Sequence, residues 1–201
     1  MGAITERRRG SVLEDAILDA AWAELSEQGY AAMTLEAVAK RAGTSRPVLH
    51  RRWPSRVKLA TAALGRYLAT NPIQVPDLGS LRAEMSLLLR GLSSRARPDL
   101  LRLLFDISGD LAAAKTRPAD LRAEITNDRT IRAVIQRAIE RGEVDPDRLT
   151  PRIIALPTDL ARHEMLMTLK PLPDEVIREI VEDIFLPLVR RDRAKPAGKL
   201  R

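Results

Sequence analysis

Cysteine is absent from this chain of 201 residues, and histidine is scarce. Without cysteine the chain forms no disulfide and no thiolate metal site. Its two histidines, His50 and His163, leave little for histidine-dependent catalysis. Asp159 and His163 are four residues apart, but no second histidine and no His-Glu-x-x-His pattern supports a metal site there. We therefore expect no metal, no cofactor and no enzymatic activity.

Long apolar runs are also missing, and aromatic residues are few. The first residues, MGAITERRRGSVLEDA, are charged, and no long apolar run follows them. We therefore expect neither a signal peptide nor a membrane anchor, and we expect the protein to be cytoplasmic. Only six aromatic residues occur, which leaves few stacking partners for a flat aromatic ligand. The formal net charge of +7 favours a polyanionic partner.

Apolar residues recur at helical spacing along most of the chain, with turn signals between the periodic segments. No strand pattern competes, so the sequence predicts an all-α protein of about nine helices. Ser11, with Glu14 three residues later, is expected to cap the first helix, and Pro157 to kink the eighth. The helices are expected over about 11–28, 35–42, 45–53, 54–70, 78–92, 98–111, 118–139, 147–169 and 173–189.

The strongest local pattern is TLEAVAKRAGTSRPVLHRRWPSRVKL, residues 34–59, which indicates a helix-turn-helix. Thr34 stands at the N-cap of its first helix, and Gly43 provides a residue free to adopt positive φ in the turn. Pro47 falls in the first turn of the second helix, where its missing N–H costs nothing. Leu49 and Trp53 are four residues apart and are expected to pack inward, which leaves a cationic outer face.

That face lies in a stretch with no Asp or Glu between Glu36 and Asp77. A solvated face on an ordinary helical hairpin usually mixes charges, whereas an acid-free basic stretch favours contact with DNA phosphates. Arg46 and Arg51 are expected to reach base edges, and Val48 a thymine methyl group. The predicted DNA-binding residues are Thr34, Ser45, Arg46, Pro47, Val48, His50, Arg51, Arg52 and Arg56.

Residues 11–60 resemble the DNA-binding end of the TetR family of bacterial repressors. The matching positions are Thr34, Leu35, Val38, Ala39, Ala42, Gly43, Ser45, Leu49 and Leu59. His50, Trp53, Arg56 and Pro47 stand where Tyr, Phe, Lys and Gly are usual. The resemblance implies a DNA-binding domain over 1–53 preceded by a short basic arm, and a ligand-binding and dimerisation domain over 54–190. The tail over 191–201 is polar and basic, and from this composition we expect it to be disordered.

The resemblance further implies a homodimer that represses at a palindromic double-stranded operator and is released by a small-molecule effector. An architectural DNA-binding protein without an effector is the alternative. The expected interface residues are Ile153, Leu160, Met167, Ile177, Ile180, Val181, Ile184 and Leu188, although these apolar stripes could instead close the chain's own core. The candidate pocket residues are Met85, Leu88, Leu89, Phe105, Asp106, Met165 and Leu166, which suit a mostly apolar effector with a group that meets Asp106 or Asp110.

Overall fold

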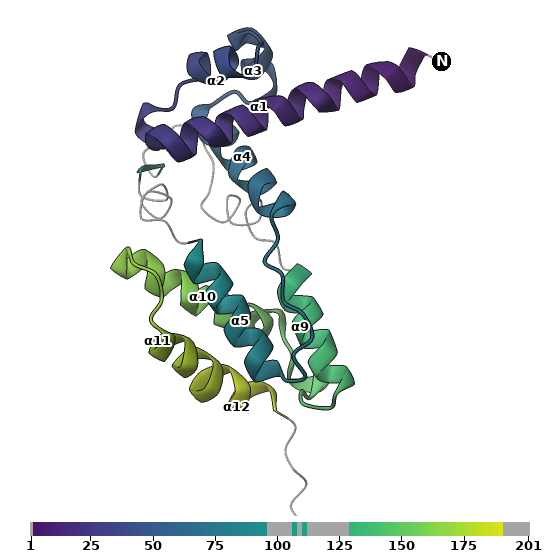
Figure 1. Ribbon diagram of the computed structural model, residues 1–201, viewed down its shortest axis with the longest axis vertical. Helices are drawn as coiled ribbons and strands as arrows, with labels where there is room; N and C mark the ends of the chain where they lie inside the picture. Colours follow the sequence, from purple (N-terminus) through teal and green to yellow (C-terminus); the bar gives the residue numbers. More distant parts are fainter. Residues whose placement is uncertain (1, 96–105, 108–109, 112–128, 191–201) are drawn as a thin grey trace, which may run out of the picture. The chain divides into compact units, whose positions relative to one another are not determined.

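The computed structural model of the chain describes residues 2–95, 106–107, 110–111 and 129–190, with side chains from residue 10 onward (Figure 1). Over these ranges the chain is helical and contains no β-strand, apart from a single antiparallel bridge between Val144 and Arg190. The all-α prediction is confirmed. Most of the helix expected over 98–111, the beginning of the one expected over 118–139, Phe105 and the basic tail lie outside the described residues.

The chain divides into two compact units. Unit 1 comprises Met1–Pro72 and Pro98–Asn127, and unit 2 comprises Ile73–Arg97 and Asp128–Arg201. The division by packing therefore falls after residue 72 rather than after residue 53, because the helix that follows the helix-turn-helix packs with the N-terminal helix. The functional boundary expected at residue 53 stays a prediction.

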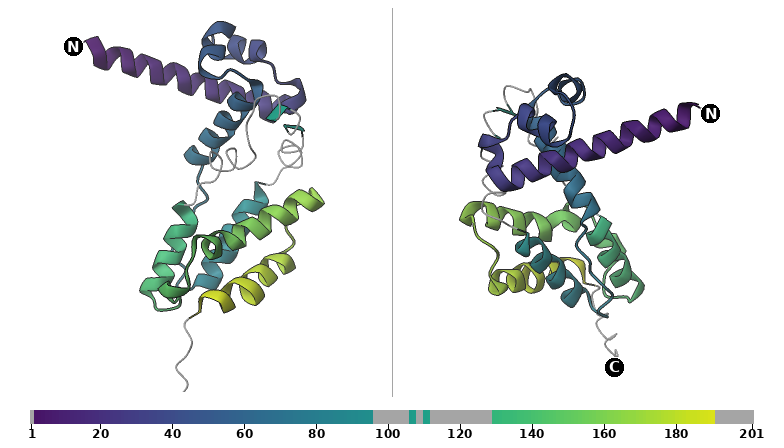
Figure 2. Two further views of the ribbon diagram at one scale, coloured as in Figure 1. Left: turned by 180° about the vertical axis from the view of Figure 1, so that it is seen from behind. Right: turned by 45° about the horizontal axis from the view of Figure 1, so that its top comes forward.

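Unit 1 begins with one long helix, α1, from Gly2 to Ala32. The prediction that Ser11 caps this helix was wrong, because the helix continues through it. The preceding residues contain no proline, and a capping pattern inside a run of helix-compatible residues does not start a helix by itself. Gly29 has φ 78° and interrupts the helical geometry near the point where the sequence predicted the helix to end. In Figures 1 and 2, α1 crosses α4, and these two helices pack together.

The helix-turn-helix consists of α2, Leu35–Arg41, and α3, Arg46–Arg52, and is followed by α4, Arg56–Thr70. The hydroxyl of Thr34 accepts a hydrogen bond from the Ala37 N–H at 3.1 Å, which confirms the predicted cap. Gly43 has φ 64°, as the tight turn requires. Ser45 occupies the N-cap position of α3, but its side chain makes no capping hydrogen bond.

An apolar core joins the helices of unit 1. Leu49 and Trp53 are buried in it, as the sequence predicted, together with Val38 of α2. Ile107 and Leu111, which lie far along the sequence, are buried in the same core. A helix of only seven residues, such as α3, is not stable alone in water. The apolar side chains that α3 buries in the core of unit 1 supply the missing stability.

Unit 2 is built around α5, Leu81–Ser94, which contacts α9, α10 and α11. The other elements are α9 (Arg129–Glu140), the 3₁₀ turn η1 (Pro146–Arg148), α10 (Pro151–Thr168), α11 (Asp174–Arg178), the π-helical segment η2 (Glu179–Phe185) and α12 (Leu186–Val189). Figure 2 shows this group from two further directions.

Two predicted helix starts in unit 2 were wrong. The helix expected from Leu78 begins at Leu81, because the Ser80 hydroxyl caps it through the Ala83 N–H, and Leu78 is exposed. The helix expected from Asp147 begins at Pro151, where the Thr150 hydroxyl accepts from the Ile153 N–H. Residues 146–148 form the separate turn η1. In both cases the helix begins where a hydroxyl cap is available, a few residues after the predicted start.

Among the described residues, the helices are too short or too polar for any of them to cross a membrane.

Candidate nucleic-acid interface

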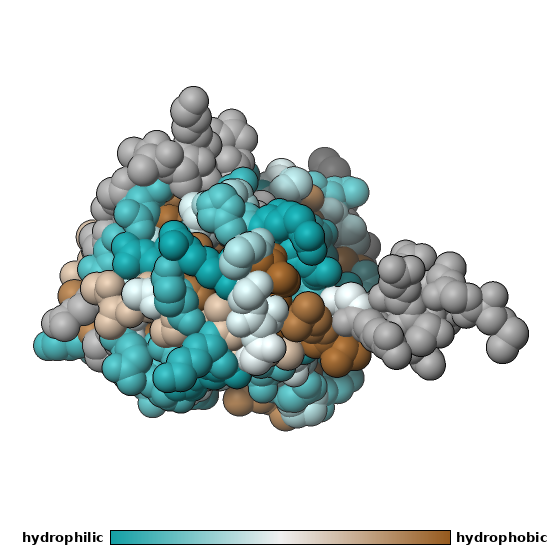
Figure 3. Space-filling model, turned by 90° about the horizontal axis from the view of Figure 1, so that it is seen from above, coloured by the Kyte–Doolittle hydropathy of each residue, from teal (hydrophilic) through white to brown (hydrophobic). Residues whose placement is uncertain are grey.

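The outer face of α3 is the most prominent candidate site of unit 1. Arg46, Pro47, His50, Arg51 and Arg52 are exposed, whereas Leu49 and Trp53 face the core. Seen from the side of α2 and α3, hydrophilic residues cover most of the surface (Figure 3). This division between buried and exposed residues follows from the helical repeat. Residues 49 and 53 are one turn apart on the buried side of α3, so the opposite side faces solvent.

Three other predicted DNA-binding residues lie around this face. Thr34 and Ser45 are exposed at the starts of α2 and α3. Val48 is only half-exposed, because part of its side chain packs against the core of unit 1. A thymine methyl group would therefore meet only the remaining part of the Val48 side chain.

Several of the basic side chains are already paired with acids. Arg46 of α3 lies 3.0 Å from Glu36 of α2, and Arg52 pairs with Glu14 of α1. Arg41 at the end of α2 pairs with Glu24 and Glu27 of α1. Its hydrogen bond to Glu27 raises the pKa of Arg41 and lowers that of Glu27. These pairs tie α2 and α3 to α1 and to one another.

Other basic side chains of this region have no partner for an ion pair among the described residues. Among the residues that the structure describes, neither Arg51 nor His50 of α3 has an ion-pair or side-chain hydrogen-bond partner, and the same holds for Lys58 of α4. A cation without an intramolecular partner loses no ion pair when it binds a phosphate or a base edge. Arg51 is therefore the α3 arginine that is most available to DNA.

Arg56 lies in a different setting from the one expected for a phosphate contact. Its guanidinium is 2.7 Å from the Asp110 carboxylate and donates to the carbonyl oxygens of Tyr30 and Ala31. It also lies over the Tyr30 ring, 4.3 Å from the centroid. The Tyr30 hydroxyl donates to the same carboxylate at 2.6 Å. The three side chains thus join the end of α1 and the start of α4 to the segment that contains Asp110.

The charge states in this cluster follow from these contacts. The hydrogen bond from Tyr30, and then the one from Arg56, lower the pKa of Asp110. Burial, and then the hydrogen bond to Asp110, raise the pKa of Tyr30. Asp110 is therefore ionised and Tyr30 neutral at neutral pH. From the sequence, Asp110 was predicted only as a contact for a ligand, because residues 56 and 110 are 54 positions apart and no local pattern links them.

The predicted interface residues fall into two groups. Ile177, Ile180 and Val181 are buried in the core of unit 2. Met167, Ile184 and Leu188 are exposed, at 58%, 39% and 42% of their surface. Ile153 and Leu160 are half-buried. The apolar stripe from Ile177 to Leu188 is thus divided: its first residues lie in the core of unit 2, and Ile184 and Leu188 are exposed to solvent.

The π-helical segment explains this division. The Leu186 N–H bonds to the Val181 carbonyl five residues earlier, and Pro187 has no N–H to offer. A π-turn takes more residues than the 3.6 of an α-turn, so side chains that follow it are rotated about the helix axis. After Val181, the buried positions are Phe185, Leu186 and Val189, whereas Ile184 and Leu188 are exposed. Leu186 is five residues after Val181, which is the spacing of a π-turn and not of an α-turn.

The predicted pocket residues do not meet in a described pocket. Met85, Leu88, Leu89 and Met165 belong to the core of unit 2, and Leu166 is half-buried. Asp106 is exposed and belongs to unit 1. Phe105 lies outside the described residues. The pocket assignment stays a prediction, since other residues of the same segments are not described.

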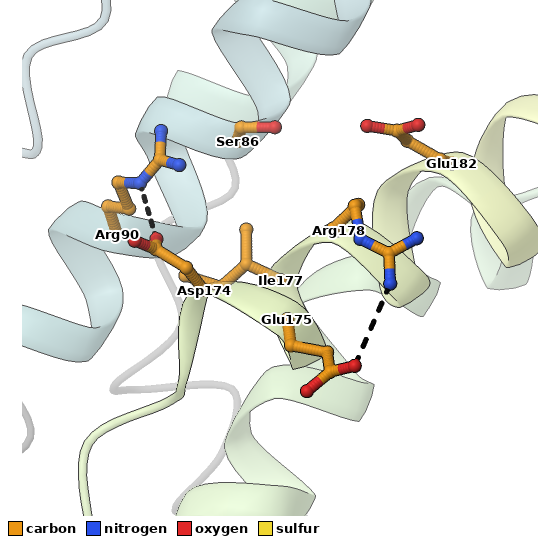
Figure 4. A pocket seen from close by; sticks show the side chains of 7 residues that line it. All are labelled: Ser86, Arg90, Asp174, Glu175, Ile177, Arg178 and Glu182. Atoms are coloured by element: carbon orange, nitrogen blue, oxygen red, sulfur yellow. Dashed lines mark hydrogen bonds and ion pairs between the residues drawn. The ribbon is translucent and has the colours of Figure 1, made fainter.

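Among the pockets on the described part of unit 2 are two open ones. One, of about 300 Å³, lies between α5 and α11, and its lining is strongly charged (Figure 4). In it Arg90 pairs with Asp174 at 2.8 Å and Arg178 with Glu175 at 3.9 Å. The other, of about 430 Å³, is lined mainly by apolar residues of α9 and by Leu149 and Ile154. None of the predicted pocket residues lines either of them.

An exposed cationic helix, held outward by an apolar core on a helix-turn-helix, is the architecture of a DNA-binding transcriptional regulator. The chain belongs to the TetR family. Residues 17–63 match the family model described as bacterial regulatory proteins of the tetR family, and residues 75–184 match the tetracyclin repressor-like C-terminal domain. The protein is thus a transcription factor and not an enzyme, as the sequence predicted.

Relatives and solved structures agree with this assignment. A DNA-binding transcriptional repressor TetR of Mycobacteroides abscessus is 29% identical over 191 residues, which cover 90% of this chain and 96% of the relative. An HTH-type transcriptional regulator of Mycobacterium tuberculosis is 25% identical, with 83% of each chain covered. The crystal structure of the TetR family regulator SCO0332 has the same fold, with a TM-score of 0.70 at 22% identity over 89% of this chain and 99% of that one.

Proposed function

We propose that the protein is a dimeric repressor that binds a palindromic operator through α3 and leaves it when an apolar small molecule binds unit 2. The observation that carries the DNA-binding part is the exposed face of α3, on which Arg51 and His50 have no intramolecular partner among the described residues. Repression, rather than activation, of transcription is supported by the name of the M. abscessus relative.

Dimerisation is supported by the exposed apolar residues of unit 2. Ile184 and Leu188 are four residues apart near the C-terminal end of the helical segment 174–189, and Met167 lies near the end of α10. A helix-turn-helix that reads one half-site gains affinity from a second copy, because a palindromic operator then binds both heads together. We assign the interface to these exposed residues and not to Ile177, Ile180 or Val181.

Replacing Arg51 with alanine should weaken operator binding by about 1–3 kcal/mol and relax specificity at one position of each half-site. The operator is obtained by selecting random duplexes with the purified protein, and affinity is measured by fluorescence anisotropy over a range of salt concentrations. Lys170→Ala removes an exposed cation of unit 2 and is the control, with no expected effect. Equal weakening of selected and random DNA would show that Arg51 contacts phosphates and not bases.

An effector can release DNA only if it favours a conformation that DNA disfavours. A compound that stabilises the protein in a thermal-shift screen should therefore bind less tightly when the operator is present, by the same factor by which it weakens DNA binding. Calorimetry of one such compound with and without the operator measures this factor. Equal affinities, or a screen with no stabilising compound, would favour the architectural DNA-binding protein instead.

A further inference from the structure

Glu36 is the only acidic residue between residues 28 and 76, in a stretch that otherwise carries basic charge. It lies in the first turn of α2, next to the Thr34 cap. Its Oε1 is 3.0 Å from Nη1 of Arg46, the first residue of α3. Both side chains are more than half exposed, at 59% and 61% of their surface. An acid on this exposed cationic surface weakens attraction to DNA, so stability alone is a poor explanation for it.

The ion pair joins the two helices of the helix-turn-helix at the N-terminal end of α3. In this class of motif, the N-terminal residues of the second helix contact base edges. A guanidinium has five N–H donors, and the pair with Glu36 engages Nη1. Donors remain for the O6 and N7 atoms of a guanine. The pairing also limits the many rotamers of a free arginine before DNA arrives, which lowers the entropy cost of an oriented contact.

We propose that Glu36 is a specificity-determining residue that positions Arg46 for a base and keeps it from the phosphates. The proposal rests on operator binding through α3, as stated above. A carboxylate beside the guanidinium repels a phosphate oxygen, so Arg46 contributes little to binding of random DNA. At the cognate site the same carboxylate holds the guanidinium in place. Glu36 thus lowers affinity for random DNA and raises the ratio between cognate and other sequences.

The pair between Glu14 and Arg52 offers a matched control. It has the same chemistry, an exposed glutamate paired with an arginine of α3, but it lies at the C-terminal end of that helix and reaches back to α1. Glu14→Gln and Glu36→Gln each remove one negative charge and keep the side-chain shape. General electrostatics changes similarly in both variants, whereas only Glu36→Gln releases Arg46.

The test measures binding of the selected operator and of its single-base-pair variants by the unaltered protein and by Glu36→Gln, Glu14→Gln, Arg46→Ala and Glu36→Gln/Arg46→Ala. We expect Glu36→Gln to bind random duplexes a few-fold more tightly and to lose about tenfold of discrimination at one position of the half-site. Arg46→Ala should lose discrimination at that same position, and the double variant should lose no more than Arg46→Ala alone. Glu14→Gln should keep discrimination at every position.

Circular dichroism verifies that each variant is folded, and Glu36→Asp, which keeps the charge, should restore part of the discrimination. Full discrimination by Glu36→Gln would overturn the proposal, as would a loss at a position that Arg46→Ala does not affect. If the unaltered protein selected no sequence from random duplexes, the proposed operator binding itself would be wrong. If selection were normal and Glu36→Gln kept full discrimination, only the role proposed for Glu36 would be wrong.

Discussion

Replacing Glu84 with alanine should lower the free energy of unfolding by about 3 kcal/mol. The Glu84 side chain has 0% exposure. Its Oε2 accepts from Nε and Nη2 of Arg137, at 2.9 and 2.6 Å, and its Oε1 lies 2.9 Å from Nη1 of Arg141. Both arginines are mostly buried. Alanine would leave the poorly solvated Arg137 without a carboxylate partner and Arg141 with only Asp77 and Glu143, which costs more than an exposed ion pair contributes.

The same carboxylate holds the chain that leads from α4 into α5. Glu84 accepts from the Leu78 N–H, and Arg137 donates to the Val75 carbonyl at 3.1 Å. Denaturant unfolding followed by circular dichroism measures the loss. Tryptophan fluorescence reports separately on unit 1, because both tryptophans, Trp22 and Trp53, belong to it. Glu140→Ala removes an exposed acid of α9 and is the control. An unchanged midpoint for Glu84→Ala would mean that the buried ion pairs contribute nothing.

Introducing a charge at Ile184 or Leu188 should dissociate the proposed dimer and abolish operator binding. A carboxylate placed in an apolar interface loses its water without gaining a partner, and we expect the dimer dissociation constant of Ile184→Glu to rise by about a hundredfold, or about 3 kcal/mol. Both side chains are partly exposed in the single chain, so helicity should survive. Sedimentation velocity and circular dichroism measure the two properties on the same sample.

The comparison with Ile180 makes this test specific. Ile180 is only 4% exposed, so Ile180→Glu should unfold unit 2 and remove circular dichroism together with dimerisation. Leu78→Glu places the same charge on an apolar side chain of unit 2 that is 48% exposed and should change neither property. A dimer of Ile184→Glu that persists at low concentration would place the interface elsewhere.

Some features of unit 2 left a signal in the sequence that the apolar pattern concealed. Glu84 follows Leu81 by three residues and precedes Leu88 by four, so it lies within the apolar stripe of α5. An acid in such a stripe indicates a buried ion pair, with its partners to be sought among the basic residues of other helices. Pro187 similarly signalled disturbed hydrogen bonding in the last helix.

The sequence by itself determined the helix-turn-helix and the face of α3 that is exposed. Those features depend on neighbours in the chain: Thr34 caps α2, Gly43 supplies positive φ, and Leu49 and Trp53 are one helical turn apart. Local steric and hydrogen-bonding rules are sufficient for each of them. The all-α class follows in the same way, because helical periodicity is repeated in most segments.

Only the tertiary structure decided which cations are free and which apolar residues are exposed. Arg52 is paired with an acid 38 positions away in the sequence, and Arg56 with one 54 positions away. No local sequence pattern links residues at such separations. The π-turn likewise placed Ile184 outside the core, because the hydrogen-bond register of this helix depends on its packing against the rest of unit 2. Contacts between distant segments form only when the chain is folded, and these contacts determine the charge and the apolar surface that a partner meets.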